Sequence, residues 1–336
     1  MKEEPIIFSI ETSCDETAVA ILKGRNTVLS NLVVSQIDIH KIFGGVVPEI
    51  AARKHLNYLN QLTNKAFEEA NIKPEEISAI AVTYGPGLVG ALLIGLNFAK
   101  GLALNLNKPL IGVNHLYGHI YANFIAFDDL EPPFLVLLVS GGHTMILHAK
   151  DYLHFEIIGQ TIDDAAGEAF DKVARLLNLG YPGGPKIDKL AQNGKPIYDF
   201  PKPLYHKGYD FSFSGLKTAL LYFTKKNDNY KIEDVAASFQ KALIDTLIHK
   251  TMKAAKDLKV DKIIIAGGVA ANSYLRKRIE EEKVKRKNMK IYFPPLNLCT
   301  DNALMIARAG YEKFIRNNFA DLSLDAVPNL GLRDIC

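Results

Sequence analysis

Residues 134–148 read FLVLLVSGGHTMILH, and this stretch predicts the fold. An apolar run stops at Ser140-Gly141-Gly142-His143 and resumes from Thr144 to His148. Short apolar runs on either side of a glycine turn are typical of a β-hairpin.

A second stretch near the amino terminus has the same order of residue types. Residues 6–22 read IIFSIETSCDETAVAIL, in which a polar turn from Glu11 to Thr17 separates two apolar segments. Helices and a third apolar strand follow each hairpin, at Ala79–Thr83 in the first half and at Lys262–Ile265 in the second. The repetition predicts an α/β fold with two duplicated lobes, each a mixed sheet flanked by helices.

Length and composition agree with two folded lobes. The chain has 336 residues, of which 48% are hydrophobic and 23% charged, as in an ordinary globular protein. We expect an N-terminal lobe at residues 1–130 and a C-terminal lobe at residues 131–336, with a helical insertion around 160–230. Two facing lobes also imply a cleft, which we expect to hold a nucleotide and a metal.

Cysteine usage and the apolar segments indicate the compartment. The three cysteines are scattered along the chain: Cys14, Cys299 and Cys336. An odd, scattered set favours a reducing compartment over a disulfide framework. The apolar run from Pro5 to Ile10 is too short for a signal peptide, and Leu88–Leu106 contains Asn97 and Lys100, which favour a packed helix over a membrane span. We expect a cytoplasmic protein with no membrane partner.

The two hairpin turns are candidates for binding phosphate. A tight glycine turn exposes backbone N–H groups, and two such turns could hold a nucleotide between them. For either hairpin alone, an ordinary tight turn is the alternative.

A third glycine motif follows a strand in the second half. Ile263–Asn272 reads IIIAGGVAAN, a buried strand that ends at Gly267-Gly268 before a helix near Ser273. Glycines allow a ligand to approach the backbone, and a helix amino terminus favours an anion or a polar ribose edge. The motif lacks GxGxxG, so a dinucleotide-fold dehydrogenase is not supported. Asn272 is either a ligand-binding residue or a helix N-cap.

A histidine pair and one carboxylate form a candidate metal site. His115 and His119 are four residues apart and would share one face of a helix. Asp301 is the best third ligand, because it follows a strand and a Pro-Pro turn and opens a helix. Two histidines and a carboxylate leave positions open for substrate. The alternative is a pair of surface or packing histidines; Leu116 replaces the glutamate that an HExxH metalloprotease needs.

Taken together, the motifs resemble one family over nearly the whole chain. In chain order they are Ile10–Thr17, Gly44–Glu49, Tyr84–Gly87, Asn114–His119, Leu138–Thr144, Gly167–Lys172, Tyr181–Pro185, Phe211–Lys217 and Cys299–Asn302. The sequence is similar to bacterial tRNA N6-adenosine threonylcarbamoyltransferases of the TsaD type, formerly labelled O-sialoglycoprotein endopeptidases. That family belongs to the actin, Hsp70 and sugar-kinase superfamily, so the resemblance implies two actin-like (ribonuclease H-like) lobes.

The resemblance also implies the ligands and the residues that bind them. His115, His119 and Asp301 would bind one iron(II) per subunit, with zinc as the alternative. The residues implied for the donor, threonylcarbamoyl-AMP, are Leu138, Val139, Ser140, Gly141, Gly142, Asp171, Gly184, Asp188 and Asn272. The acceptor would be the adenosine 3′ of the anticodon in tRNAs that read codons beginning with adenine.

The reaction needs orientation and a proton acceptor more than it needs an activated water. The donor carbonyl is already activated, so a cation would act as Lewis acid and template. Asp15 and Glu16 in the first turn are candidate bases for the attacking amine. An ordinary acidic turn is the alternative for both residues.

The RNA-binding surface is less clear in the sequence. A net charge of +3 is small for a nucleic-acid binder, so positive charge must be local or come from another subunit. Candidate phosphate contacts are His40-Lys41, Arg53-Lys54-His55 and the basic run Lys283–Lys290. A solvated helix face is the alternative for the last of these.

The sequence leaves three alternatives to transfer, and the resemblance implies two protein partners. An actin-like ATPase or kinase, a non-catalytic scaffold subunit of the same modification complex and a glycoprotein peptidase are the alternatives to transfer. The resemblance implies a TsaB-type paralogous subunit and a TsaE-type P-loop ATPase as partners. It also suggests Pro48–Ala70 and the helix from Leu88 as the dimer surface.

Overall fold

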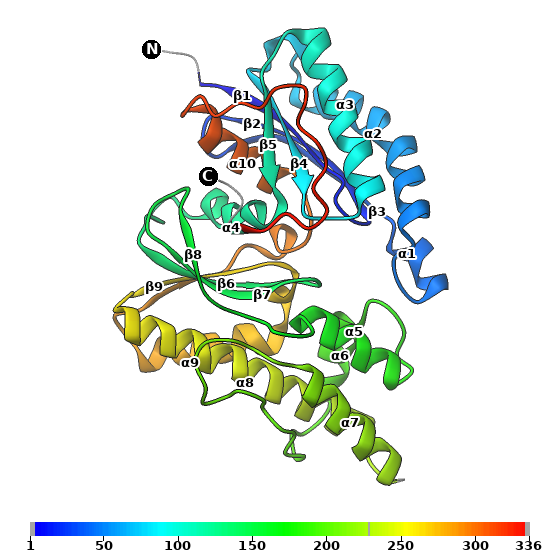
Figure 1. The fold of residues 1–336 in the computed structure, drawn as a ribbon, viewed down its shortest axis with the longest axis vertical. Coiled ribbons are helices and arrows are strands. Elements are labelled where there is room, and N and C mark those ends of the chain that lie inside the picture. Colours follow the sequence, from blue (N-terminus) through cyan, green and yellow to red (C-terminus); the bar gives the residue numbers. More distant parts are fainter. Residues whose placement is uncertain (1–3, 228, 333–336) are drawn as a thin grey trace. The chain divides into compact units, whose positions relative to one another are not determined.

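The structure, a computed structural model, describes residues 4–227 and 229–332. These residues form two compact units (Figure 1). The first unit contains the described residues up to Leu130 and those from Thr300 onward, and the second is Glu131–Cys299. Cys14 and Cys299 are free thiols, whereas Cys336 and Met1-Lys2-Glu3 lie outside the described residues.

The first unit is built on a five-stranded mixed sheet in the order β3-β2-β1-β4-β5. The strands are β1 (Ile6–Glu11), β2 (Glu16–Lys23), β3 (Thr27–Ser35), β4 (Ala79–Gly85) and β5 (Leu110–Asn114). β1 pairs antiparallel with β2 and parallel with β4. Of the outer pairs, β2–β3 is antiparallel and β4–β5 is parallel. Both faces of β1 and β4 are buried, which explains why most of their residues are apolar.

The second unit repeats this arrangement in the order β10-β9-β6-β7-β8. Its strands are β6 (Phe134–Val139), β7 (Thr144–Ala149), β8 (Phe155–Gln160), β9 (Lys262–Ala266) and β10 (Lys290–Tyr292). β6 pairs antiparallel with β7 and parallel with β9, as β1 does with β2 and β4. The duplication predicted from the two hairpins is confirmed.

Helices cover both faces of the first sheet. They are α1 (Ile37–His40), α2 (Pro48–Ala70), α3 (Val89–Leu106), α4 (His115–Ala126) and α10 (Ala303–Phe314), with short 3-10 turns at Lys41–Phe43 and Pro74–Glu76. Phe8 and Ile10 on β1 pack in the core formed with α2 and α3. The alternate residue Ser9 faces α10, since its hydroxyl donates to the Ala303 carbonyl over 2.7 Å.

Helix α10 corrects the predicted lobe boundary. The C-terminal lobe was expected to run to residue 336, but the described residues from Thr300 onward belong to the first unit. α10 packs against β1, β2 and β4, and Gly310 allows this because a Cβ there would lie 2.7 Å from the Cβ of Ala81. Sequence order alone did not reveal that the chain returns to its first sheet.

Helix α3 is the apolar segment that the sequence assigned to the protein interior. By length and composition, it is the one helix in the described part of the chain that could span a membrane. Leu96, Ala99 and Ala103 on this helix lie in the first core, and α3 packs against α2 and β4. Its packing is that of a helix within the first unit.

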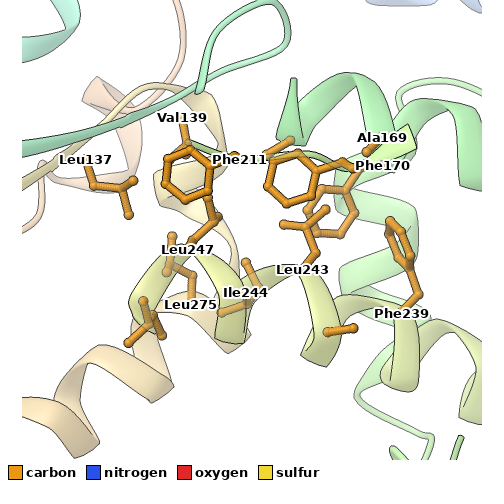
Figure 2. Close-up of a cluster of buried hydrophobic side chains, with 14 of the residues drawn as sticks. Leu137, Val139, Ala169, Phe170, Phe211, Phe239, Leu243, Ile244, Leu247 and Leu275 are labelled. Atoms are coloured by element: carbon orange, nitrogen blue, oxygen red, sulfur yellow. The ribbon is translucent and has the colours of Figure 1, made fainter. Parts of the chain in front are cut away.

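The helices of the second unit enclose a large apolar core. They are α5 (Ala166–Leu176), α6 (Gly183–Ala191), α7 (Ser214–Lys226), α8 (Ile232–Leu258) and α9 (Ser273–Lys285), with 3-10 turns at Gly268–Ala271 and Leu296–Leu298. Figure 2 shows Leu137 and Val139 of β6 facing Leu243 and Leu247 of α8, with Phe170 of α5 nearby. α5, α6 and α7 fall in the range expected for the helical insertion.

Candidate active site

The histidine pair lies on the first turns of α4. Asn114 ends β5 and caps the helix, because its side-chain oxygen accepts the Leu116 N–H over 2.8 Å. His115 and His119 follow one turn apart, and their ring centroids are 4.7 Å from each other. The predicted helical spacing therefore places both imidazoles on one side of α4.

Asp301 meets the two imidazoles from the start of α10. Asn302 caps that helix by accepting the Met305 N–H over 3.0 Å, which fixes the residue before it. Asp301 Oδ1 lies 3.2 Å from His119 Nε2 and 3.5 Å from His115 Nε2. One ligand atom from each of the three residues lies within 4.8 Å of the others, so the predicted triad is assembled.

Gly118, between the two histidines, lies in close contact with α10. A Cβ at Gly118 would lie 2.7 Å from Ile306 Cδ1 and 3.0 Å from Met305 Cγ, both on α10. A glycine is unfavourable inside a helix, but here it lets α4 approach α10 closely. That close approach is what brings Asp301 to the histidines.

Glu11 orients His115 and was not predicted to have a role. Its Oε2 lies 3.0 Å from His115 Nδ1, and it also accepts the Thr83 hydroxyl over 2.6 Å. The other oxygen accepts the Ser13 N–H over 2.5 Å, and the side chain is fully buried. A carboxylate at the end of an apolar strand was the available signal, because such a group is seldom buried without partners.

The histidines and carboxylates in this cluster shift one another's pKa values. Burial lowers the pKa of His115, but the Asp301 and Glu11 carboxylates outweigh it and raise that pKa to about 9. Burial raises the pKa of Asp301, but the two histidines reduce it to about 2. Without a cation, the histidine proton therefore balances carboxylates that would otherwise be buried and unpaired.

The donor set fits a divalent transition metal. Ligand atoms about 2.1 Å from one cation lie roughly 3.0 to 3.4 Å apart in octahedral or tetrahedral geometry. The measured separations of 3.2 and 3.5 Å from Asp301 Oδ1 to the two imidazole nitrogens are close to that range. Two imidazoles and a carboxylate also leave coordination positions for a substrate.

Asp15 and Glu16 lie in the same unit, at the end of the first hairpin turn. Asp15 is almost fully buried, and the two carboxyl groups share a hydrogen bond. Burial, followed by the negative charges of Asp301 and Asp15, raises the pKa of Glu16 to about 10. In this state Glu16 carries a proton at neutral pH and donates the hydrogen bond to Asp15.

Two histidines proposed as RNA contacts have structural roles instead. His55 on α2 is fully buried, with its ring nitrogens 2.8 Å from the Thr17 hydroxyl and 2.9 Å from the Cys14 carbonyl. His40 is also fully buried, and its Nδ1 accepts the Val47 N–H over 3.3 Å. Neither ring can reach a phosphate, so those two predictions are wrong.

The second hairpin turn has the exposed backbone that its sequence predicted. The Ser140 N–H donates to the His143 carbonyl over 2.8 Å, and the Ser140 hydroxyl oxygen accepts the His143 N–H over 3.1 Å. Gly141 and Gly142 are exposed, and a Cβ at either would meet no atom within 4 Å. Among the residues described, their N–H groups have no hydrogen-bond partner, and they remain available to a ligand.

Other glycines hold that turn in place. Gly267 has φ +89°, and a Cβ there would lie 2.4 Å from the Val139 carbonyl oxygen. A Cβ at Gly167, at the start of α5, would lie 2.7 Å from the Ser140 carbonyl oxygen and 2.8 Å from Gly141 Cα. The candidate residues Leu138 and Val139 are fully buried in β6.

Asp171 and Asp188 already bind the amino termini of two helices. The Asp171 carboxylate accepts the N–H groups of Gly183 and Gly184 at the start of α6, at 2.7 Å for Gly183. Burial nevertheless raises the pKa of Asp171 above its ordinary value. Asp188 accepts both the N–H and the hydroxyl of Ser273, at 2.9 and 2.8 Å, at the start of α9.

Asn272 caps α9, which is one of the two roles that the sequence predicted for it. Its side-chain oxygen accepts the Leu275 N–H over 2.9 Å, and its amide group donates to Gln240 Oε1 over 2.7 Å. Gly184, beside Asp171, has open space where a Cβ would be, as Gly268 does beyond β9. The predicted donor residues all belong to the second unit, while the candidate metal triad belongs to the first.

Known proteins match the chain over almost all its length. A family model described as TsaD: tRNA N6-adenosine threonylcarbamoyltransferase matches residues 27–308. A curated protein of that name from Thermosipho melanesiensis is 59% identical over 329 residues, covering 97% of this chain and 100% of the relative. One from Clostridium perfringens is 56% identical over 336 residues, covering 98% and 99%.

Solved structures show the same fold at low identity. Full-length HypF in a phosphate- and nucleotide-bound form has a TM-score of 0.66 and 14% identity, covering 95% of this chain and 48% of HypF. HypF from T. kodakarensis gives a TM-score of 0.66 at 16% identity, covering 96% and 49%. The chain thus spans about half the length of these proteins, and the predicted actin-like fold is confirmed.

Proposed function

The chain belongs to the tRNA N6-adenosine threonylcarbamoyltransferase family, and we propose that it transfers the threonylcarbamoyl group of threonylcarbamoyl-AMP to adenosine in tRNA. The acceptor in this proposal is N6 of the adenosine 3′ of the anticodon, in tRNAs that read codons beginning with adenine. The observation that carries the proposal is the His115, His119 and Asp301 cluster, within 4.8 Å, in a chain whose relatives have this name.

The second unit is proposed to bind the AMP part of the donor. The free N–H groups of Gly141 and Gly142 suit a phosphate, because backbone donors in a glycine turn form an anion-binding nest. Gly184 offers open backbone in the first turn of α6, where a flat adenine ring could approach. Asp188 and Asn272 would bind the ribose hydroxyls through their side-chain oxygens. Ser273 and Leu275 donate hydrogen bonds to these oxygens but do not use all of their lone pairs.

The first unit is proposed to supply the transfer chemistry. The N6 amine attacks the carbamoyl carbon, the carbon–oxygen bond to phosphate breaks, and AMP leaves with that electron pair. Asp15 takes the proton lost by N6, while Glu16, with its raised pKa, donates a hydrogen bond to Asp15. A cation held by His115, His119 and Asp301 would stabilise negative charge on the phosphate or carbonyl oxygens as a Lewis acid.

Iron(II), one per subunit, is the proposed metal, and zinc is the alternative. The ligand types support both candidates, because imidazole together with carboxylate suits iron(II) and zinc alike. Elemental analysis of chain purified without oxygen, combined with the activity restored by each ion after chelation, would separate the two.

Several partners are proposed on the family resemblance. The tRNA would present its anticodon loop, and a TsaB-type subunit and a TsaE-type ATPase would assemble with the chain in the cytoplasm. Helices α2 and α3 support a protein partner because they pack together and expose Leu56, Val89 and Leu104. Size measurements on mixtures of the chain with each partner would test the assembly.

A reconstituted transfer reaction tests the proposed function directly. Purified chain, with and without the two partners, is incubated with synthetic threonylcarbamoyl-AMP and unmodified tRNA. Threonylcarbamoyladenosine in digested tRNA, detected by mass, would support transfer. Turnover of ATP with a sugar acceptor, and no modified nucleoside, would support an actin-like kinase instead.

A further inference from the structure

A groove runs along the carboxyl-terminal halves of α8 and α9 in the second unit. It consists of two cavities of about 650 and 480 Å³ that share Met252, Lys256 and Arg286. We call it the basic groove. It contains none of the residues assigned above to the donor or the metal.

The larger cavity has a strong excess of positive charge. Five cationic side chains line it: Lys256, Lys259, Lys285, Arg286 and Lys287. Asp261 is the one carboxylate among its lining residues. The whole 336-residue chain has a formal net charge of only +3, so this excess is larger than that of the entire protein.

Most of these cations are not neutralised by the fold. Lys285 and Arg286 share one carboxylate, Glu282. Lys256, Lys259 and Lys287 are exposed and have no ion-pair partner among residues 4–227 and 229–332. Cations near a helix carboxyl terminus interact favourably with the helix dipole. This explains why Lys256 and Lys285 lie in the last turns of their helices. The helix dipole does not account for Lys259 and Lys287, which lie beyond the last turns of α8 and α9.

The smaller cavity is nearly neutral, because Asp245, Asp257 and Glu282 line it together with Lys253, Lys256, Arg278 and Arg286. What it adds to the groove is aromatic rings. Tyr205 and His249 line it with their ring centroids 4.1 Å apart and their planes 14° from parallel. Lys253 lines the same cavity and lies 4.1 Å from the ring centroid of Tyr209. Lysines interleaved with aromatic rings are typical of surfaces that bind RNA, whose phosphates and bases they contact together.

We propose that the basic groove binds the phosphate backbone of the tRNA substrate. Flexible lysines in an open groove suit a mobile polyanion better than one small ligand, which would need converging buried donors. Val260 and Asp261 place the groove at the amino end of β9, and the donor-side Gly267 follows its carboxyl end. Five residues of strand separate these ends by about 15 Å, so the RNA would extend beyond the adenosine being modified.

Binding of unmodified tRNA to the full chain at several salt concentrations tests this inference. The double variant Lys256→Glu with Lys287→Glu should weaken binding on the order of tenfold per lysine near 0.1 M salt. The slope of log affinity against log salt should fall by about two. Lys256→Arg with Lys287→Arg should bind as wild type does, because the charge is kept.

A matched control comes from another helix end of the same unit. Lys225 and Lys226 are exposed in the last turn of α7, so Lys225→Glu with Lys226→Glu changes the net charge equally. This control should retain wild-type affinity and salt slope. Equal weakening by both pairs would show general electrostatics and overturn the proposal.

This inference takes the identity of the RNA from the proposed function. The groove and the transfer activity can nevertheless be tested separately. The binding experiment contains no donor, so its result does not depend on transfer. If tRNA binding depends on the groove but the reconstituted reaction gives no transfer, the inference stands and the proposed function is rejected. Unchanged tRNA binding by the Lys256→Glu, Lys287→Glu variant would overturn the inference whether or not transfer occurs. Polyglutamate, tested with the same variants, serves as a probe for an acidic protein. If the Lys256→Glu, Lys287→Glu variant loses polyglutamate binding but keeps tRNA binding, the occupant is an acidic protein and the inference is overturned.

Discussion

Glu11 Oε2 lies 3.0 Å from His115 Nδ1, on the opposite side of the imidazole from the nitrogen that faces Asp301. A carboxylate in this position fixes the tautomer and orientation of a metal-binding histidine. Glu11 is itself fixed, because it accepts hydrogen bonds from Ser13 and Thr83 and is fully buried. The end of β1 therefore determines which way a ligand on α4 points.

The first prediction concerns the strength of cation binding. Glu11→Gln should reduce cation affinity about 10- to 100-fold, because the amide cannot hold His115 as a carboxylate does. Competition with a coloured chelator measures this directly. Glu69→Gln is the matched control, since Glu69 accepts the Ser30 hydroxyl in the same unit and should leave affinity unchanged. Equal affinity of Glu11→Gln and wild type would show that Glu11 does not orient the ligand.

The second prediction concerns pH and the cation. Because the pKa of His115 is raised to about 9, the histidine must lose a proton before it can coordinate a metal. Between about pH 7 and 9, cation affinity should rise roughly tenfold per pH unit, with about one proton released per cation. Calorimetry in buffers of different ionisation enthalpy counts that proton. Affinity that does not change over this range would contradict the charge assignment.

The third prediction concerns the stability of the cation-free chain. The pKa of His115 is raised from 6.5 to about 9, so its contribution is complete below pH 6.5 and is lost as pH rises through 9. The loss should be on the order of 3 kcal/mol. Chemical denaturation at pH 6 and pH 9 checks this, with His115→Gln as the control that should lose the pH dependence.

The fourth prediction separates a ligand-binding glycine from a structural one. Gly142→Ala should leave stability within about 0.5 kcal/mol, because a Cβ there meets no atom within 4 Å. It should nevertheless weaken AMP binding, since the added methyl group stands beside the exposed N–H groups. Gly267→Ala should be strongly destabilising, because φ is +89° and its Cβ would lie 2.4 Å from a carbonyl oxygen.

Thermal unfolding and binding of a fluorescent AMP analogue measure the two effects. Normal AMP binding by Gly142→Ala would exclude the turn as a phosphate site. A fully stable Gly267→Ala chain would contradict the packing described for the second hairpin.

Local patterns in the sequence predicted the two sheets and the cluster of His115, His119 and Asp301. Both hairpins have apolar strands around a polar turn, and the four-residue spacing of His115 and His119 places them on one helix face. Asp301 could be chosen because it follows β10 and precedes α10, which is local information as well. These predictions depend on periodicity and spacing, which a single sequence contains.

Features that depend on distant packing could not be predicted. The return of α10 to the first sheet depends on Gly310 meeting Ala81, more than two hundred residues away in the chain. The burial of His55 depends on its hydrogen bonds to Thr17 and the Cys14 carbonyl, across from α2. Its neighbours Arg53 and Lys54 suggested a solvated basic cluster, because the sequence does not show which side of α2 faces the sheet.

Transfer by a metal-ligand variant is the most direct test of the central claim. His119→Ala and wild type are compared with synthetic threonylcarbamoyl-AMP, unmodified tRNA and the two proposed partners. Cation content and the yield of threonylcarbamoyladenosine are measured on the same samples. We predict that the variant loses both the cation and the modified nucleoside while it still binds an AMP analogue. A variant without bound cation that modifies tRNA at the wild-type rate would contradict the role given to His115, His119 and Asp301.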